Sequence, residues 1–262
     1  MPDPSAVRSM FARISGTYDL LNRGLSMGLD QHWRRAALNL ISAGESLGGQ
    51  TVVDICTGTG DLALLAARAG AQVVGLDFTH EMVARAPAKA EKQSSKAILG
   101  ATLFVHGDAQ NLPLVSSQAD AATVAFGIRN TSDRIQTLKE MARVVRPGGR
   151  VVVLEFSRPR SAFFGALYRG YFTRVLPCLG RIVSRDADAY SYLPRTVLAW
   201  PDPEEFQAEF QALGLLECGF RRLTGGIACL HHGTVASSAD PIQESSVVAS
   251  SNLSMSRKVV KS

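Results

Sequence analysis

Three carboxylates stand at or near the ends of successive β-branched runs, and a glycine-rich turn follows the first of them. Asp54 precedes the turn 56–60 (Cys-Thr-Gly-Thr-Gly), Asp77 ends the second run and Asp108 ends the third. A turn of this kind lets backbone N–H groups approach a ligand where a Cβ atom would clash. A carboxylate after the second strand can accept hydrogen bonds from ribose hydroxyls. The spacing therefore predicts a site for a nucleotide-like ligand.

The glycine spacing by itself leaves two ligand classes open, because the segment 58–63 also satisfies the loose dinucleotide fingerprint G-x-G-x-x-A. Asp54 lies inside the first strand, where a dinucleotide fold has small or apolar residues, and Asp108 can accept from an adenine amino group. The segment 146–149 (Arg-Pro-Gly-Gly) ends a helix just before a strand. Each acid alone is as well explained by a helix cap or a solvated carboxylate. Together these features resemble class I methyltransferases and favour S-adenosylmethionine over a nicotinamide cofactor.

These residues need a sheet to position them, and the chain alternates β-branched runs with helical patterns. Such alternation predicts parallel strands joined by right-handed crossovers, with helices on both faces. We therefore predict an α/β fold of the class I S-adenosylmethionine-dependent methyltransferase type, with a Rossmann-like seven-stranded sheet whose last strand is antiparallel. The expected strands are 51–55, 72–77, 102–108, 120–126 and 150–156, then a hairpin around Thr224-Gly225-Gly226; the expected helices include 62–70, 80–92, 134–145 and 204–214.

Composition excludes several classes of protein. The 262 residues are 46% hydrophobic, which excludes a chain disordered throughout. No stretch reaches the roughly 18 uncharged apolar residues that span a bilayer, and no secretory signal is visible at the start of the chain. The four cysteines have no ligand-like spacing, so reduced thiols and a cytoplasmic location are expected. The net charge of +5 suggests an anionic partner.

Four stretches make the chain resemble the ubiquinone/menaquinone biosynthesis C-methyltransferases. They are 7–26 with its central Tyr-Asp-Leu-Leu-Asn, the turn 56–61, 126–130 (Phe-Gly-Ile-Arg-Asn) and 186–193 (Asp-Ala-Asp-Ala-Tyr-Ser-Tyr-Leu). The resemblance covers about residues 5–233. It implies transfer of one methyl group from S-adenosylmethionine to a ring carbon of a prenylated quinol. The implied cofactor residues are Gly58, Thr59, Gly60, Asp77, Asp108 and Ala109.

The same resemblance divides the chain into three parts. Residues 1–48, mostly helical in pattern, are expected to form a lid segment over the site. Residues 49–234 are expected to form the methyltransferase domain, with a substrate-recognition insertion at about 158–200. Residues 235–262 are rich in serine and without aromatic residues, and are expected to be a disordered tail.

Methylation of a ring carbon needs the sulfonium methyl aligned with that carbon, and it needs a group that takes the proton of the adjacent hydroxyl or holds the resulting oxyanion. It needs no metal, and no cluster of metal ligands stands out in the sequence. We expect Arg129 to hold the oxyanion or orient a water, because a guanidinium is a poor base. Asn130 is expected to position the ring. A salt bridge from Arg129 that merely shapes the loop is the alternative.

Two further segments are expected to reach the substrate. Tyr18 either contacts substrate or cofactor or packs within the lid. Acidic and tyrosine residues recur at every second position from 186 to 192, which would place them on one side of an extended segment. From this segment we expect Asp188 to accept a proton and Tyr190 to contact substrate, unless the segment is a hydrogen-bonded structural corner.

The basic charge gathers in the insertion. Residues 158–185 contain six arginines and no acid, interleaved with aromatic residues that form an apolar helical stripe. Packing of the stripe against the sheet is one explanation. A prenylated quinol resides in the bilayer, however, so we expect transient contact with an anionic membrane surface at its inner face. Nucleic acid is not an expected partner, and a homodimer is left open.

The preferred substrate is demethylmenaquinol, which would be converted to menaquinol. This preference comes from Ala125 and the segment 224–228. Ring methylation in the ubiquinone or phylloquinone pathway, or methylation of another small hydrophobic acceptor, is left open. The alternative outside enzymes is a nucleotide-binding module that recruits partners to membranes.

Overall fold

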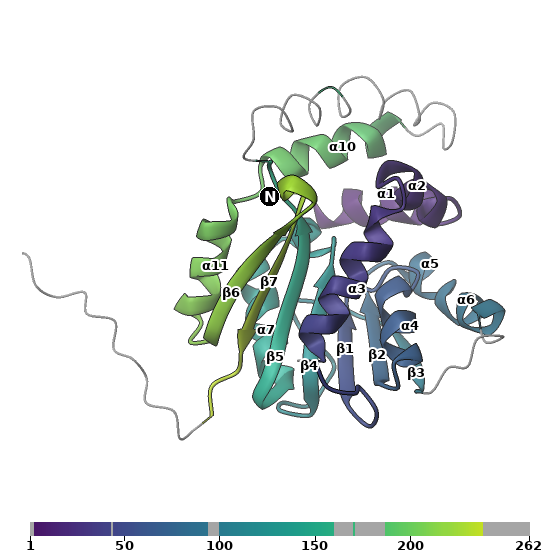
Figure 1. The fold of residues 1–262 in the computed structure, drawn as a ribbon. Coiled ribbons are helices and arrows are strands. Elements are labelled where there is room, and N and C mark those ends of the chain that lie inside the picture. Colours follow the sequence, from purple (N-terminus) through teal and green to yellow (C-terminus); the bar gives the residue numbers. More distant parts are fainter. Residues whose placement is uncertain (1–2, 43, 94–99, 160–169, 171–186, 238–262) are drawn as a thin grey trace, which may run out of the picture.

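A seven-stranded mixed sheet forms the centre of the protein (Figure 1). The computed structural model describes residues 3–42, 44–93, 100–159, 170 and 187–237. The strands lie in the order β3-β2-β1-β4-β5-β7-β6. Their bounds are β1 Thr51–Ile55, β2 Gln72–Asp77, β3 Thr102–His106, β4 Ala119–Ala125, β5 Val145–Phe156, β6 Leu216–Leu223 and β7 Ala228–Thr234.

The first five strands pair in parallel, and β7 pairs antiparallel with both β5 and β6. The predicted fold class, with seven strands and an antiparallel last strand, is confirmed. Parallel pairing brings the carboxyl ends of β1, β2 and β4 to one edge of the sheet, where ligands of open α/β sheets bind. The hairpin turns back so that β7 lies between β5 and β6, an order that the hydrophobic pattern does not specify.

Helices cover both faces of the sheet. Their bounds are α1 Pro4–Ile14, α2 Tyr18–Leu25, α3 Leu29–Ile41, α4 Asp61–Arg68, α5 His80–Val83, α6 Ala86–Gln93, α7 Arg134–Val144, α10 Ala187–Leu198 and α11 Pro203–Ala212, with short 3-10 turns η1 Ile128–Asn130 and η3 Thr224–Gly226. Alternate strand residues enter different cores because successive side chains point to opposite faces. Val52 packs with α3 and α4, whereas Val53 packs with α7 and α11.

The N-terminal helices lie beyond the end of the sheet that carries the site. Figure 1 shows α1 and α2 there together with α10, while α3 runs down the face of the sheet. Trp33 fixes α3: it is 1% exposed, and its indole N–H donates to the Thr224 hydroxyl at 2.8 Å. None of the helices in the described part of the chain combines the length and apolar character needed to span a bilayer.

Three element predictions were wrong in detail. The single helix expected over 80–92 is divided into α5 and α6, because Pro87 lacks an N–H and restricts the residue before it. Strand β5 begins at Val145, five residues before the expected start at Arg150. The segment expected to be extended around 186–192 is instead the start of helix α10 from Ala187 onward.

Candidate active site

The glycine-rich turn is held from beneath by Asp54. This carboxylate accepts a hydrogen bond from the Thr57 hydroxyl at 2.6 Å and another from the Ala63 N–H at 3.2 Å. Burial of Asp54 raises its pKa to about 6. Gly60 has a φ of +85°, and a Cβ there would lie 2.9 Å from the Phe104 ring. Asp54 thus shapes the turn and the start of α4 from inside the core.

Asp77 and Asp108 line one cavity, called here the first cavity. Asp77 accepts hydrogen bonds from the Gly58 N–H and the Thr79 N–H, both at 2.8 Å, and burial raises its pKa. Asp108 accepts from the Gln110 N–H at 2.9 Å. Other lining residues are Gly58, Phe78, Ala109, Ala125, Gly127 and Asn130. The two carboxylates therefore lie together at one edge of the sheet, as predicted.

Two predicted cofactor residues, Thr59 and Gly60, do not line the first cavity. Thr59 is 4% exposed, and its hydroxyl donates to the Asp19 carboxylate at 2.5 Å. Its side chain therefore serves the contact between the turn and α2 in this structure. The glycine spacing predicted the turn correctly, but it did not predict the direction of the Thr59 hydroxyl.

A second cavity adjoins the first, and the two share Phe11, Tyr18 and Phe126 in their walls. It is formed by α1, α2 and α3 together with the ends of β4 and β5 and by α10. Most of its lining is apolar, but two arginines and one aspartate also face it. The remaining lining residues are Met10, Ile14, Leu21, Asn22, Ser26, Asp30, Arg34, Arg129, Phe156 and Tyr192.

Tyr18 stands between the two cavities at the first turn of α2. Burial raises the pKa of its phenol, while a hydrogen bond with Asn22 and the charges of Arg34 and Arg129 act in the opposite direction. Its prediction as a residue of the substrate site agrees with this placement, although contact with a substrate stays a prediction.

Arg129 lines the second cavity but has a carboxylate partner. Its Nη1 lies 2.5 Å from Glu155 Oε1 and donates to the Phe126 carbonyl at 2.6 Å. Glu155 is fully buried, and this burial raises its pKa, against the influence of Arg129. The salt bridge that the sequence left open as an alternative is therefore present, and it fixes the loop after β4.

Asn130 connects the two cavities through Tyr192. The Tyr192 hydroxyl donates to Asn130 Oδ1 at 3.0 Å. Tyr192, which lines the second cavity, therefore helps to hold the Asn130 side chain in the wall of the first cavity. Asp188 and Tyr190 lie on α10, and their side chains are outside the described residues.

Asp30 and Arg34 face the second cavity from α3, but neither was predicted from the sequence as a site residue. They are 3% and 6% exposed. Opposite charges four residues apart are typical of a solvated helix surface, so the pair gave no distinctive signal. The useful signal was Trp33 between them, because a large aromatic residue there indicates that this side of the helix is buried.

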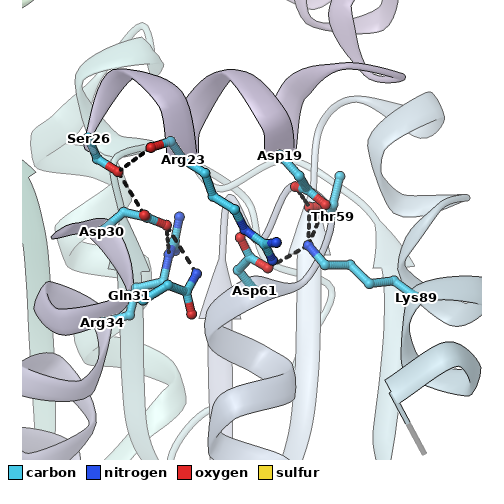
Figure 2. A network of polar contacts seen from close by, with 9 residues as sticks. All are labelled: Asp19, Arg23, Ser26, Asp30, Gln31, Arg34, Thr59, Asp61 and Lys89. Carbon is cyan, nitrogen blue, oxygen red and sulfur yellow. Dashed lines mark hydrogen bonds and ion pairs between the residues drawn. The ribbon is translucent and has the colours of Figure 1, made fainter. Parts of the chain in front are cut away.

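A cluster of polar contacts anchors α2 to the rest of the domain (Figure 2). Lys89 Nζ lies 2.6 Å from Asp19 Oδ2 and 2.5 Å from Asp61 Oδ1, and it also donates to Thr59 at 2.9 Å. Burial opposes the ionisation of Asp61, but the charges of Arg34 and Lys89 outweigh it and lower the pKa. Lys89 therefore neutralises two carboxylates from different helices.

Replacing Lys89 with Met should loosen α2. The change leaves Asp19 and Asp61 without the cation between them, and like charges then repel in a poorly hydrated position. Amide hydrogen exchange over 18–25 should accelerate about tenfold or more. Lys139→Met, an exposed lysine on α7, is the matched control. Unchanged exchange in Lys89→Met would show that the cluster does not hold α2.

Comparison with known proteins places the whole arrangement among methyltransferases. Residues 3–235 match the model of the ubiE/COQ5 methyltransferase family. The demethylmenaquinone methyltransferase of Deinococcus radiodurans is 47% identical, covering 85% of this chain and 90% of that protein. The corresponding Thermus thermophilus protein is 46% identical, covering 86% and 99%. The ubiquinone/menaquinone biosynthesis C-methyltransferase of Geobacter sulfurreducens is 43% identical, covering 87% of each chain.

Solved structures share the fold at low sequence identity. Magnesium protoporphyrin IX methyltransferase from Synechocystis, solved with bound S-adenosylhomocysteine, gives a TM-score of 0.61 at 16% identity, covering 89% of this chain and 100% of that one. The [4+2]-cyclase SpnF gives 0.62 at 16% identity, covering 90% and 97%. Because the second is named for a different reaction, the fold alone does not decide the chemistry.

Proposed function

The chain belongs to the ubiE/COQ5 methyltransferase family and is an S-adenosylmethionine-dependent methyltransferase, and we propose that it methylates a ring carbon of a prenylated quinol, most specifically demethylmenaquinol. The single observation that carries the proposal is the pairing of two cavities across Tyr18 and Phe126. One cavity has strand-end carboxylates suited to a nucleoside. The other is mostly apolar and carries charged groups suited to a ring hydroxyl.

The residues of the first cavity fit S-adenosylmethionine. Asp77 is buried, and its carboxylate accepts hydrogen bonds from the backbone N–H groups of Gly58 and Thr79 and from the Thr79 side chain. Such a carboxylate can accept hydrogen bonds from two ribose hydroxyls, and Asp108 can accept from the adenine amino group. When bound, the cofactor supplies a sulfonium methyl group that is already a good electrophile. The protein's task is then to orient the acceptor carbon toward it.

The second cavity fits a prenylated aromatic ring. Phe126 and Phe156 lie with ring centroids 4.6 Å apart and give it an aromatic floor. A third, more open cavity shares Met10, Arg129 and Tyr192 with it. A ring held beside Tyr18 would leave its prenyl chain a path through this opening.

Roles in the reaction follow from these positions. Asn130 lines the first cavity and accepts a hydrogen bond from the Tyr192 hydroxyl, which supports its proposed role of positioning the ring. Arg129 adds positive charge to the wall, although Glu155 offsets much of it. Asp188 as proton acceptor and Tyr190 as substrate contact stay predictions from the sequence.

Transfer of tritiated methyl from S-adenosylmethionine to short-chain quinols tests the proposal. We expect incorporation into a demethylated naphthoquinol, and slower incorporation into the matching benzoquinol. The product should carry one methyl group on a ring carbon. Incorporation only into a phenolic acceptor without a prenyl chain, or none into any quinol despite cofactor binding, would contradict the proposal.

Asp77→Asn should weaken cofactor binding. An amide retains the shape but removes the charge that strengthens hydrogen bonds from ribose hydroxyls. The Kd for S-adenosylhomocysteine, measured by calorimetry, should rise about tenfold to 100-fold. Glu81→Gln, an exposed acid on the nearby helix α5, should leave it unchanged. Equal affinities for Asp77→Asn and the unmutated protein would place the ribose elsewhere.

Membrane contact is a further part of the proposal, and it is supported by the sequence alone. Of the arginine-rich segment 158–185, the residues 160–169 and 171–185 lie outside the described residues. Arg158 is described and pairs with Asp202 at 2.9 Å. We expect stronger sedimentation with vesicles containing anionic lipid than with neutral vesicles, and release by added salt. Equal binding to both vesicles would contradict it.

A further inference from the structure

Arg34 is a buried cation whose hydrogen-bonding capacity is not filled. The residue is 6% exposed, and its Nε has no hydrogen-bond partner among the residues that the structure describes. The nearest carboxylate oxygen, Asp30 Oδ2, lies 3.7 Å from Nε, beyond hydrogen-bonding distance. A buried guanidinium N–H without an acceptor is disfavoured, because it has lost water and gained no partner in exchange. Its position therefore favours a ligand that brings an acceptor.

The position of Arg34 is fixed from several sides. Its neighbour Trp33 is locked by the hydrogen bond to Thr224 and packs against Phe126 and Phe156. The Arg34 Cζ itself lies 5.4 Å from the centre of the Phe126 ring. Since Phe126 belongs to the walls of both cavities, Arg34 is held at the place where they meet.

The two arginines of the second cavity differ in how far their charge is neutralised. Arg129 forms a short ion pair with a fully buried glutamate and also donates to a backbone carbonyl. Among the described residues, the ion pair of Arg34 is the longer contact with Asp30, and its charge also acts on Asp61 without forming an ion pair. The Nε atoms of both arginines lack a hydrogen-bond partner there, so the two differ in the closeness of their carboxylates. Of the two, Arg34 therefore keeps more of its charge available to a bound anion.

Asp30 is a carboxylate beside this cation at the first turn of α3. Figure 2 shows it between Ser26 and the pair of side chains Gln31 and Arg34. The Ser26 hydroxyl donates to Oδ1 at 2.7 Å, and the Gln31 amide donates to Oδ2 at 3.1 Å. Each carboxylate oxygen can accept further bonds, and Asp30 lines the second cavity.

We propose that Arg34 and Asp30 together bind the acidic hydroxyl of the acceptor ring, with Asp30 taking its proton and Arg34 holding the oxyanion that results. The inference rests on the proposed function for the identity of the ring. It assigns the oxyanion to α3 in place of the loop after β4 that carries Arg129. It also assigns the proton acceptor to Asp30 in place of Asp188, the residue expected from the sequence.

The ring hydroxyl gives its proton to Asp30, and the oxyanion's electrons make the neighbouring ring carbon nucleophilic. That carbon forms a bond to the methyl group as the sulfur–methyl bond breaks, leaving a neutral thioether. The ring carbon then loses its hydrogen as a proton, which restores the aromatic ring. Asp30 returns its proton to the ring oxygen, so one proton is released overall.

Binding of an aryl oxyanion tests the site without turnover. The probe is a nitronaphthol whose ionised form is coloured, added to protein saturated with S-adenosylhomocysteine. Arg34→Met should weaken binding of the ionised form about tenfold to 100-fold, and Arg34→Lys should recover part of the loss. Arg35→Met, the adjacent exposed arginine, is the control. All variants should bind S-adenosylhomocysteine and unfold cooperatively like the unmutated protein.

Equal affinity of Arg34→Met and the unmutated protein for the ionised probe, or no binding to either, would overturn the inference. If binding depends on Arg34 but no quinol is methylated, the proposed function fails while the oxyanion site stands. If quinols are methylated at the same rate by Arg34→Met, the proposed function stands and the inference fails.

The pH dependence of turnover tests Asp30. In Asp30→Asn the hydroxyl must ionise without its acceptor, so kcat at neutral pH should fall about 100-fold and then rise with pH as hydroxide replaces the carboxylate. KM for the quinol should change much less. Asp30→Glu should retain part of the activity. An unchanged pH profile in Asp30→Asn would show that Asp30 does not accept the proton and serves only as a hydrogen-bond partner of Ser26.

Discussion

Burial of carboxylates at the carboxyl edge of the sheet is the constraint on which the site depends. Asp54, Asp77 and Glu155 lie on three of the central strands, and burial raises the pKa of each. A buried carboxylate must be hydrogen-bonded to be tolerated. Asp54 is satisfied by the glycine-rich turn and Glu155 by the loop that carries Arg129. The same bonds that satisfy the acids therefore fix the two loops that form the cavities.

The charges around the second cavity are arranged in opposed pairs of unequal closeness. Glu155 forms a close ion pair with Arg129, whereas Asp30 lies farther from Arg34. In a poorly hydrated cavity, small differences in separation change electrostatic interactions considerably. The tight pair is thus suited to building the wall, and the loose pair is suited to chemistry. Because each arginine has a carboxylate partner, one mostly apolar cavity can contain two arginines without an excess of positive charge.

The sequence predicted the sheet and the strand-end carboxylates because parallel strands bring consecutive carboxyl ends together, whatever the details of packing. It predicted less where the outcome depends on contacts between distant segments. The direction of the Thr59 hydroxyl depends on Asp19, forty residues earlier. The alternation around 186–192 was misleading, since it spans too few residues to separate a strand from the helix observed. Arg34 was missed because burial of that side of α3 arises from its packing against Phe126 and the sheet.

The two cavities draw on different parts of the chain. The polar wall of the first comes mainly from strand ends within the domain, whereas the second is enclosed by three helices that precede β1 and by α10, which lies after β5. The helices α1 and α2 serve both cavities, since Phe11 and Tyr18 line both, whereas α3 lines the second and not the first. Substitutions on α3 would therefore alter acceptor preference while leaving the nucleoside site in place, which is a route by which one scaffold diversifies its substrates.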